Sequence, residues 1–277
     1  MTSRTITRRV RGIPTSDGAG VKLTRVIGQR ALEMLDPFLM LDEFGSDAAT
    51  DYIAGFPNHP HRGFETVTYM LDGRMRHRDN AGNEGLLQSG SVQWMTAGRG
   101  IIHSEMPEQD HGLMRGFQLW VNLPAKDKMT APRYQDIAPE EIPSVEPAQG
   151  VRVRVVAGEL SGARGPVSGV ATEPVYLDVA LQPGAQVEIP LPATHNAFAY
   201  VFEGDGVRVG AKTLAHRELG VLSPGDSLLL VAADKPARVL VVAGKPLNEP
   251  VAKYGPFVMN TPEQIVQAMQ DYQAGRF

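Results

Sequence analysis

The stretches His59-Pro60-His61 and His103-Ser104-Glu105 decide the fold of this chain. Each carries two metal-binding side chains at positions i and i+2. On a β-strand this spacing places both side chains on one face, roughly 6.6 Å apart at Cα. Two such strands side by side would direct four side chains at one point. Three imidazoles and a carboxylate suit a borderline divalent metal better than calcium or magnesium, so the sequence predicts a mononuclear metal protein built on a small β-barrel.

The first histidine pair alone is weak evidence for a metal site, and the residues around it strengthen the prediction. With 7 histidines in 277 residues, about 0.2 His-x-His pairs are expected by chance. Glycines that suit tight turns, Gly55 and Gly73, punctuate the segment around the first pair, and Gly90 and Gly98 precede the second. The alternative is that these histidines lie in the core or on the surface with their hydrogen bonds satisfied. Four potential ligands in two strand-spaced pairs favour the metal site.

Composition excludes several classes of protein. The net charge is −4 with a pI of about 6.0, so no basic surface is expected for direct binding of nucleic acid. The chain has no cysteine, which excludes disulfides, thiolate metal sites and iron–sulfur clusters. The longest apolar runs are too short to cross a bilayer, and no signal peptide is recognisable. A soluble cytoplasmic protein is therefore expected.

Turn residues and short apolar runs predict an all-β chain with two barrels. The 29 glycines and 21 prolines suit many short strands joined by turns. A second series of strands begins at Val151, after a charged stretch that reads as a linker. Its turn Phe202-Glu203-Gly204 resembles Leu71-Asp72-Gly73 of the first series, which indicates an internal repeat. The expected domains are residues 1–137 and 138–277.

The second half lacks the ligand pattern of the first. It has only Ala193-Thr194-His195 where the first half has His59 and His61, and nothing like His103-x-Glu105 follows Ser227. One metal site is therefore predicted, in the N-terminal half. A degenerate second site at His195 and His216 is the alternative, and structural or surface roles are favoured for both.

The end of the chain predicts a short helix. Thr261-Pro262-Glu263-Gln264 has the pattern of a capping box with proline at the first helical position. Ile265, Ala268, Met269 and Tyr272 then fall on one helical face, and Gly275 ends the pattern. This face is expected to pack on a barrel.

Several long motifs resemble the pirin family of the cupin superfamily. The resemblance extends over nearly the whole chain and rests on Asn58-His-Pro-His-Arg-Gly-Phe-Glu-Thr-Val67, Gln93-Trp-Met-Thr-Ala-Gly-Arg-Gly-Ile101, His103-Ser-Glu-Met-Pro107, Gln118-Leu-Trp-Val-Asn-Leu123 and Gly255-Pro-Phe-Val-Met-Asn-Thr261. It implies a bicupin, with two double-stranded β-helix barrels and a short C-terminal helix. Residues 1–137 would form the metal-binding barrel, and residues 138–277 a degenerate barrel with the helix.

The resemblance also implies a ligand set. His59, His61, His103 and Glu105 would hold a single metal, most often Fe(II) in this family, with Zn, Mn, Ni, Co or Cu as alternatives. Most cupins take the metal carboxylate from the first motif, where this chain has Glu65. The pirin pattern takes it from the second motif, at Glu105, which leaves Glu65 a supporting or structural role.

Some pirins act as quercetin 2,3-dioxygenases, so the resemblance implies cleavage of a flavonol with O2 and release of carbon monoxide. Glu105 would serve as the catalytic base for the flavonol 3-hydroxyl. A flat aromatic substrate needs an apolar pocket, and residues near the motifs that could line it are Phe56, Trp94, Met106, Phe117 and Gln118. The family habit implies a monomer.

Two other functions remain open. Some pirins act as metal- or redox-dependent partners of other proteins, in which case dioxygenase activity would be incidental. The second is a different cupin reaction, such as isomerisation or hydrolysis with zinc, manganese or nickel. Turnover without consumption of O2 would favour this second alternative.

Overall fold

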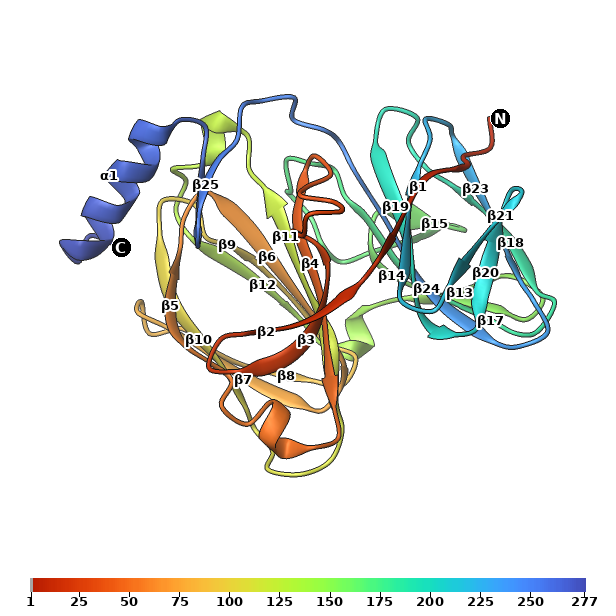
Figure 1. Cartoon of the computed structure of the whole chain (residues 1–277), viewed down its shortest axis with the longest axis horizontal. Coiled ribbons are helices and arrows are strands. Elements are labelled where there is room, and N and C mark those ends of the chain that lie inside the picture. Colours follow the sequence, from red (N-terminus) through yellow and green to blue (C-terminus); the bar gives the residue numbers. More distant parts are fainter. Residues whose placement is uncertain (1) are drawn as a thin grey trace. The chain divides into compact units, whose positions relative to one another are not determined.

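The computed structural model describes residues 2–277, which form antiparallel β-sheets and one α-helix, divided into two compact units (Figure 1). The N-terminal unit contains Ile13–Gln29, Phe38–Pro139 and Leu247–Phe277. The C-terminal unit contains the residues up to Gly12, Arg30–Pro37 and Glu140–Pro246. The predicted all-β class with a short C-terminal helix is confirmed.

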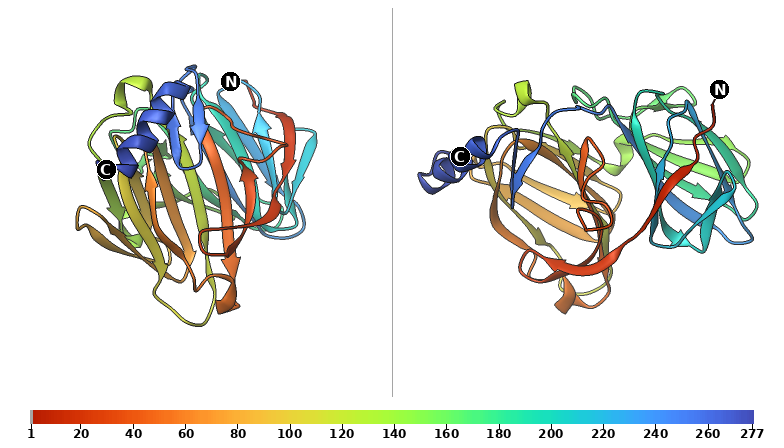
Figure 2. Two further views of the ribbon diagram at one scale, coloured as in Figure 1. Left: turned by 60° about the vertical axis from the view of Figure 1, so that its left-hand side comes forward. Right: turned by 45° about the horizontal axis from the view of Figure 1, so that its top comes forward.

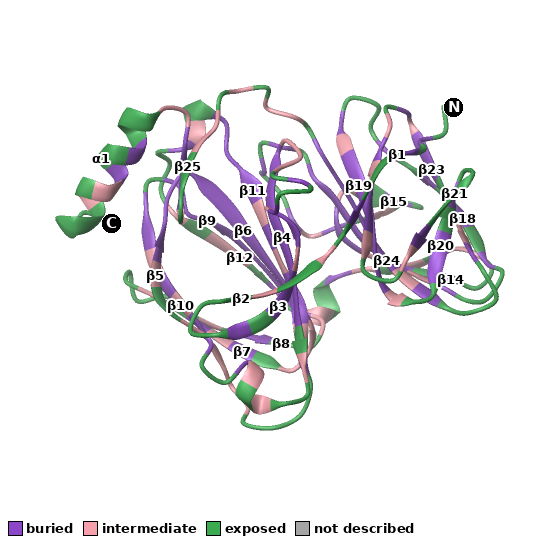
Figure 3. Cartoon of the chain, viewed as in Figure 1, coloured by how far each residue is buried: buried purple, intermediate pink, exposed green. Residues whose placement is uncertain are grey.

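The N-terminal unit is built from a seven-stranded and a four-stranded sheet. The larger sheet has the order β12-β9-β6-β11-β4-β3-β2, with β2 (Ile13–Asp17), β3 (Val21–Ile27), β4 (Phe38–Ser46), β6 (Phe64–Asp72), β9 (Val92–Thr96), β11 (Met114–Asn122) and β12 (Arg133–Ile137). The smaller sheet has the order β5-β10-β7-β8, with β5 (Phe56–His61), β7 (Arg74–Asp79), β8 (Glu84–Gln88) and β10 (Ile101–Pro107). Most residues of β6, β9 and β11 are buried (Figure 3).

The C-terminal unit repeats this arrangement strand for strand. Its larger sheet has the order β1-β22-β19-β24-β17-β14-β13, with β1 (Ile6–Arg11), β13 (Ser144–Ala148), β14 (Val151–Ala157), β17 (Val175–Leu181), β19 (Asn196–Gly204), β22 (Glu218–Leu222) and β24 (Ala237–Gly244). Its smaller sheet has the order β18-β23-β20-β21, with β18 (Gln186–Pro190), β20 (Gly206–Val209), β21 (Lys212–Ala215) and β23 (Ser227–Ala232). A two-stranded ribbon, β15 (Glu159–Leu160) and β16 (Ala163–Arg164), completes it.

The interior of the C-terminal unit is filled with aliphatic side chains. By sheet order, β23 corresponds to β10 and β18 corresponds to β5. Where β10 carries His103 and Glu105, β23 carries Leu228 and Leu230, both fully buried in one continuous core. Because leucine offers no ligand atom, this barrel is packed for stability at the place where the other has polar side chains.

Both ends of the chain depart from the expected domain division. The units separate between Pro139 and Glu140, close to the predicted boundary at 137/138. Strand β1, however, belongs to the C-terminal unit, because it pairs with β22 and buries Ile6 and Val10 there. Residues 247–277 belong to the N-terminal unit, so the C-terminal helix is part of the barrel expected to bind metal. The expected domains are two continuous segments, so a division by sequence position could not assign either end of the chain to the other unit.

The last segment of the chain is fixed to the N-terminal unit by a hairpin and a helix, seen from two sides in Figure 2. The hairpin consists of β25 (Ala252–Tyr254) and β26 (Phe257–Met259), and the helix is α1 (Pro262–Gln273). The predicted capping box is present, since Thr261 accepts from the Gln264 backbone N–H and the Gln264 side chain accepts from the Thr261 N–H. Ile265 and Ala268 are buried, as the periodicity predicts.

The Arg62 guanidinium anchors the helix. It donates to Asp271 at 2.6 Å and stacks over the Phe277 ring at 4.3 Å. At 12 residues, α1 falls well short of a membrane span, and no other helix within residues 2–277 is long and apolar enough to cross one.

Candidate metal centre

Strand β5 presents two histidines from the edge of the smaller sheet. Its neighbour is β10 on one side only. Pro57 and Pro60 lack an N–H and are therefore tolerated at an edge but not inside a sheet. Because side chains alternate along a strand, His59 and His61 share a face while Pro60 points to the other. The i, i+2 interpretation of the sequence is confirmed for this pair.

His103 completes a group of three imidazoles. In the antiparallel register of β5 and β10, His103 lies opposite His59, and Ile101 lies opposite His61. Each histidine offers one ring nitrogen such that the three atoms all lie within 4.8 Å of one another. His59 Nε2 and His61 Nε2 are 3.0 Å apart. His59, His61 and His103 form the one group of three or more possible metal-binding side chains found within residues 2–277.

The nitrogen atoms of this group suit a metal ion. Ligands at 2.0–2.1 Å from a metal and at right angles to each other stand about 3.0 Å apart, the separation of the two Nε2 atoms on β5. His103 Nε2 is buried and has no hydrogen-bond partner. Burial holds the pKa of His61 and of His103 well below the ordinary value, so both rings are neutral and keep a lone pair. The three histidines therefore fit a cation better than they fit an ordinary polar core.

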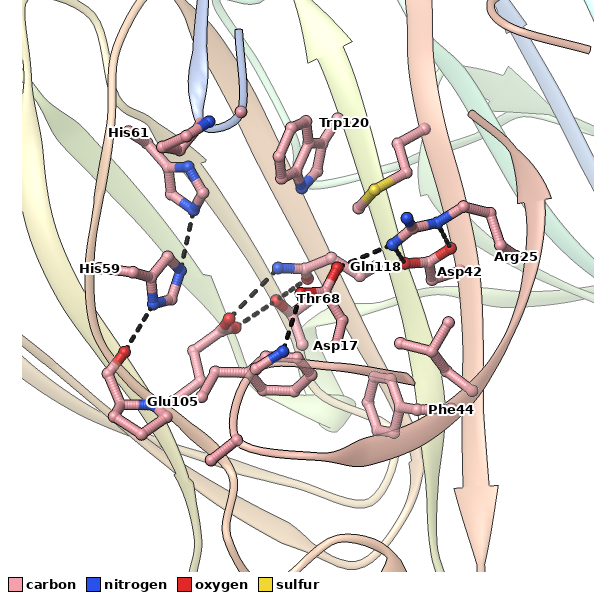
Figure 4. Close-up of a pocket in the computed structure, with 18 of the residues that line it drawn as sticks. Asp17, Arg25, Asp42, Phe44, His59, His61, Thr68, Glu105, Gln118 and Trp120 are labelled. Carbon is pink, nitrogen blue, oxygen red and sulfur yellow. Dashed lines mark hydrogen bonds and ion pairs between the residues drawn. The ribbon is translucent and has the colours of Figure 1, made fainter. Parts of the chain in front are cut away.

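Glu105 lies on the same strand as His103 but outside the three-histidine group. A register shift between His103 and Glu105 places Glu105 opposite Phe56. Its carboxylate is buried; Oε1 lies 2.9 Å from Thr68 Oγ1, and Oε2 accepts from Gln118 Nε2 at 3.2 Å. Thr68 Oγ1 also lies 2.6 Å from Gln118 Oε1, and its single proton can serve only one acceptor at a time. Figure 4 shows these three side chains beside the histidine pair.

Glu65 is held away from the histidines. It is buried on β6, and its Oε1 accepts from Thr96 Oγ1 at 2.7 Å. Burial raises the pKa of its carboxyl group. Glu65 is four residues after His61, so the two side chains would share a face on one continuous strand. Gly63, with φ +88°, turns the chain between their two strands and removes this relation. Glu65 does not line the cavity beside the histidines, which agrees with a structural role.

A cavity of about 590 Å³ opens beside the histidines. Its walls include His59, His61, Thr68, Glu105 and Gln118. The remaining polar and apolar lining includes Asp17, Leu23, Arg25, Met40, Asp42, Phe44, Phe56, Met75, Trp120, Lys253 and Pro256. All of these residues belong to the N-terminal unit. The volume is in the range of pockets that enclose small organic molecules.

The wall away from the histidines is charged (Figure 4). Arg25 donates to both carboxylate oxygens of Asp42, at 2.9 and 2.7 Å, and to Asp17 at 2.8 Å. The hydrogen bond with Asp42 raises the pKa of Arg25. Lys253 lies with its Nζ 5.1 Å from the centre of the Trp120 ring, and partial burial lowers the pKa of its ammonium group. No single motif in the sequence marks this wall, because its members come from β2, β3, β4, β11 and β25.

The predicted lining residues divide into two groups. Phe56 and Gln118 do line the cavity. Trp94 and Phe117 do not, since both are buried in the packed interior. Met106 follows Glu105 on β10 and is also absent from the cavity wall. On β11, alternation sends Gln118 and Trp120 to the cavity and Phe117 to the opposite face, a register that the sequence motif could not fix.

The two other histidines that we considered for a second site lie in the C-terminal unit. His195 is buried beside Arg4, which donates to the His195 carbonyl oxygen at 3.0 Å. His216 Nε2 lies 3.2 Å from the Phe202 carbonyl oxygen. Neither belongs to a group of three metal-binding side chains within residues 2–277.

Comparison with known proteins agrees with this architecture. Residues 20–121 match the model of the pirin family, and residues 176–277 match the model of the pirin C-terminal cupin domain. A pirin-like protein of Caulobacter vibrioides is 53% identical over 278 residues, covering 100% of each chain. A Pseudomonas aeruginosa protein provisionally named quercetin 2,3-dioxygenase is 55% identical over 270 residues, covering 95% of this chain and 94% of its own.

Solved structures give the same result. The crystal structure of a quercetin 2,3-dioxygenase from Acinetobacter baumannii superposes with a TM-score of 0.92 at 35% identity, covering 99% of this chain and 98% of its own. The bicupin fold is thereby confirmed. The two family models, the full-length relatives and the two repeated barrels together show that this chain belongs to the pirin family.

Proposed function

We propose that the chain is a mononuclear metal dioxygenase that cleaves a flavonol with O2 and releases carbon monoxide. The observation that carries the proposal is the convergence of three imidazoles, two of which, His59 and His61, line a cavity that also holds the Glu105 carboxylate. The provisional name of the Pseudomonas relative and the name of the Acinetobacter structure support this choice of reaction.

In this proposal His59, His61, His103 and Glu105 hold the metal. The three histidines lie together, whereas Glu105 lies outside their group and would have to move toward it to bind the same ion. Fe(II) is the metal that we propose for the site, and Zn, Mn, Ni, Co or Cu would fit the same donor set. When bound, it would act as a Lewis acid and supply the means of using O2.

Glu105 is proposed as the base that removes the proton of the flavonol 3-hydroxyl. Its carboxylate faces the cavity, and its contacts with Thr68 and Gln118 fix it from one side. Thr68 can turn its single hydroxyl proton from Glu105 to Gln118. The carboxylate could then take up the substrate proton while Gln118 keeps it in place.

The shape and lining of the cavity support a flat, polyhydroxylated aromatic substrate. Phe44, Phe56 and Trp120 offer aromatic faces. The Arg25–Asp42 pair, across the cavity from His59 and His61, offers hydrogen-bond partners to hydroxyl groups of the substrate, and Lys253 offers another beside Trp120. The separation of a metal-binding end from a polar end would orient the ring that is cleaved.

The test is O2 uptake together with carbon monoxide release when quercetin is added to protein loaded anaerobically with Fe(II). His61→Ala is the variant that lacks a ligand, and His111→Ala is the control, because His111 is exposed and outside the cavity. Equal yields of O2 consumed and carbon monoxide released, lost in His61→Ala alone, are expected.

Two outcomes would redirect the proposal. Turnover without O2 consumption would favour an isomerase or hydrolase. Absence of turnover, despite confirmed metal occupancy, would favour a regulatory role in which the metal state controls binding to a protein partner. Affinity capture from cell extracts, with the metal-loaded and the metal-free protein as bait, would then identify proteins that bind only one of the two forms.

A further inference from the structure

A line of four polar side chains leads from His103 to the edge of the N-terminal unit. His103 Nδ1 lies 3.3 Å from His77 Nδ1, and His77 Nε2 lies 2.9 Å from the Tyr134 hydroxyl. That hydroxyl lies 2.9 Å from Asp79 Oδ2. His77 and Asp79 come from β7, which pairs with β10, and Tyr134 comes from β12. His77 is fully buried, so each of its ring nitrogens needs a partner within the protein.

The direction of these hydrogen bonds is fixed at the Asp79 end. Oδ1 of Asp79 accepts from the backbone N–H groups of Ala81 and Asn83, at 2.9 and 2.8 Å. Oδ2 accepts from the Asn83 amide at 2.7 Å, in addition to Tyr134. Burial raises the pKa of Asp79, but these hydrogen bonds outweigh it and leave the pKa below the ordinary value. An ionised carboxylate only accepts, so the single Tyr134 proton is committed to it.

The remaining directions follow in turn. The Tyr134 hydroxyl donates its hydrogen bond to Asp79, so its oxygen is left to accept a hydrogen bond from His77 Nε2–H. His77 is fully buried, an environment that disfavours a charged imidazolium, and a neutral imidazole has one N–H, which leaves His77 Nδ1 as an acceptor. The facing Nδ1 of His103 then has to be the donor. The tautomer that results leaves the lone pair of His103 on Nε2, the buried atom without a hydrogen-bond partner.

We propose that Asp79, Tyr134 and His77 are positioning residues that fix the tautomer and the ring orientation of His103, so that its Nε2 is ready for a metal before any metal binds. Outer partners of this kind commonly orient a metal-binding histidine through its other nitrogen. His59 is oriented independently, because its Nδ1 lies 2.8 Å from the Pro57 carbonyl oxygen and donates to it. Any role of these residues in catalysis rests on the proposed function, whereas the predicted tautomer of His103 is independent of it.

The variant that tests the direction is Asp79→Asn. The two backbone N–H groups would keep the amide oxygen at the Oδ1 position, and the Asn83 amide would turn its oxygen toward the new amide nitrogen, which would face Tyr134. Tyr134 would then accept from that amide nitrogen and donate to His77 Nε2, which reverses every bond in the line. The His103 proton would move to Nε2, the atom expected to bind the metal. Tyr134→Phe is the second variant, which interrupts the line without reversing it.

The readout is the ¹⁵N–¹H correlation spectrum of the histidine rings in metal-free protein, followed by affinity for Zn(II) measured by competition with a chromophoric chelator. We expect the Nδ1–H form of His103 in the unchanged protein, the Nε2–H form in Asp79→Asn and a mixture in Tyr134→Phe. Zn(II) should bind about 10–100-fold more weakly to Asp79→Asn. His59 should keep its tautomer in all three proteins.

Tyr254→Phe is the matched control, because Tyr254 is exposed and has no part in this line. A His103 tautomer and a Zn(II) affinity that are the same in all variants would overturn the proposal, as would an Nε2–H form in the unchanged protein. The spectra need neither Fe(II) nor a flavonol. Failure of the dioxygenase assay would therefore leave this result standing, and the reverse also holds.

Discussion

His59 and His103 lie directly opposite each other across β5 and β10, with their ring centres 4.3 Å apart. The group of three histidines thus depends on the pairing of an edge strand with its one neighbour. Removing the β10 histidine leaves a pair, which cannot surround an ion from three sides.

His103→Ala should therefore lower affinity for Zn(II) by more than about 100-fold, since outer partners of a ligand alone contribute 10–100-fold. Metal content after dialysis against a defined Zn(II) concentration measures the effect. His111→Ala should retain full occupancy because its side chain is 93% exposed. Equal occupancy in both variants would remove His103 from the site.

Glu105→Gln and Glu65→Gln compare two buried carboxylates. Glutamine at position 105 can still accept from Thr68, so the fold should be kept while the basic oxygen and the negative charge are lost. We expect kcat to fall by about 100-fold or more with quercetin, the usual size of a general-base contribution. Glu65→Gln should leave kcat within about twofold. Steady-state kinetics at matched metal content distinguishes the two.

Gly63→Ala should destabilise the N-terminal unit far more than Gly82→Ala. The two glycines have nearly the same φ angle, +88° and +87°. A Cβ at Gly63 would collide with the Val258 carbonyl oxygen, whereas a Cβ at Gly82 meets nothing within 4 Å. Gly82→Ala should cost about 1 kcal/mol from backbone strain, and Gly63→Ala about 3 kcal/mol or more. Denaturant unfolding of the metal-free proteins gives both values.

Lys128 should make stability rise with pH in the alkaline range. Its ammonium is buried and donates to Gly63 O, Asn122 Oδ1 and Val258 O at 2.7, 2.6 and 3.0 Å. Burial lowers its pKa from 10.5 to about 8. Between these values the unfolded chain holds a proton that the folded chain has released, so raising the pH favours folding.

The free energy of unfolding should gain up to about 3 kcal/mol from this group between pH 8 and 10.5. Lys128→Met lacks the titrating ammonium, so its pH profile serves as the baseline. The stability that this variant loses measures the cost of leaving three buried oxygens without a hydrogen-bond donor. A pH profile parallel in the two proteins would mean that Lys128 keeps an ordinary pKa.

Lys253→Met should affect recognition of substrate rather than metal. The ammonium lies on the cavity wall with its Nζ 5.1 Å from the centre of the Trp120 ring, and Lys253 is not one of the proposed metal ligands. We expect KM for quercetin to rise about 10- to 100-fold, equivalent to the loss of one hydrogen bond to a charged group, with metal content unchanged. Lys126→Met is the control, since Lys126 is exposed and outside the cavity. An unchanged KM would show that the charged wall does not touch the substrate.

The sequence predicts the strand-spaced ligands well because alternation along a strand is a local property. His59, His61 and His103 meet as the spacing indicates, and the capping box at Thr261 forms as written. Glu105 is buried on the strand that carries His103 and lines the cavity, and its role as a metal ligand stays a prediction.

Long-range assembly explains the other differences. The Arg25–Asp42 pair joins β3 to β4 outside every motif, and Lys253 comes from the far end of the chain, so spacing within one segment could not bring them together. His77 escaped notice for the same reason: its neighbour is His103, 26 residues later in the sequence. Pairing of β1 with β22 likewise depends on contacts across more than 200 residues, which a division by sequence position cannot anticipate.

The assignment of residues 247–277 to the N-terminal unit has a consequence for biosynthesis. Most of that unit, within residues 13–139, is made before residues 140–246. The Val258 carbonyl that accepts from Lys128 and the Asp271 carboxylate that pairs with Arg62 are made only after them. At 5–20 residues per second this interval is on the order of 5–20 s. During that time Lys128 and Arg62 have to remain hydrated or be shielded by a chaperone. Nascent chains stalled before Leu247 should therefore be more open to protease around Gly63 than released chains.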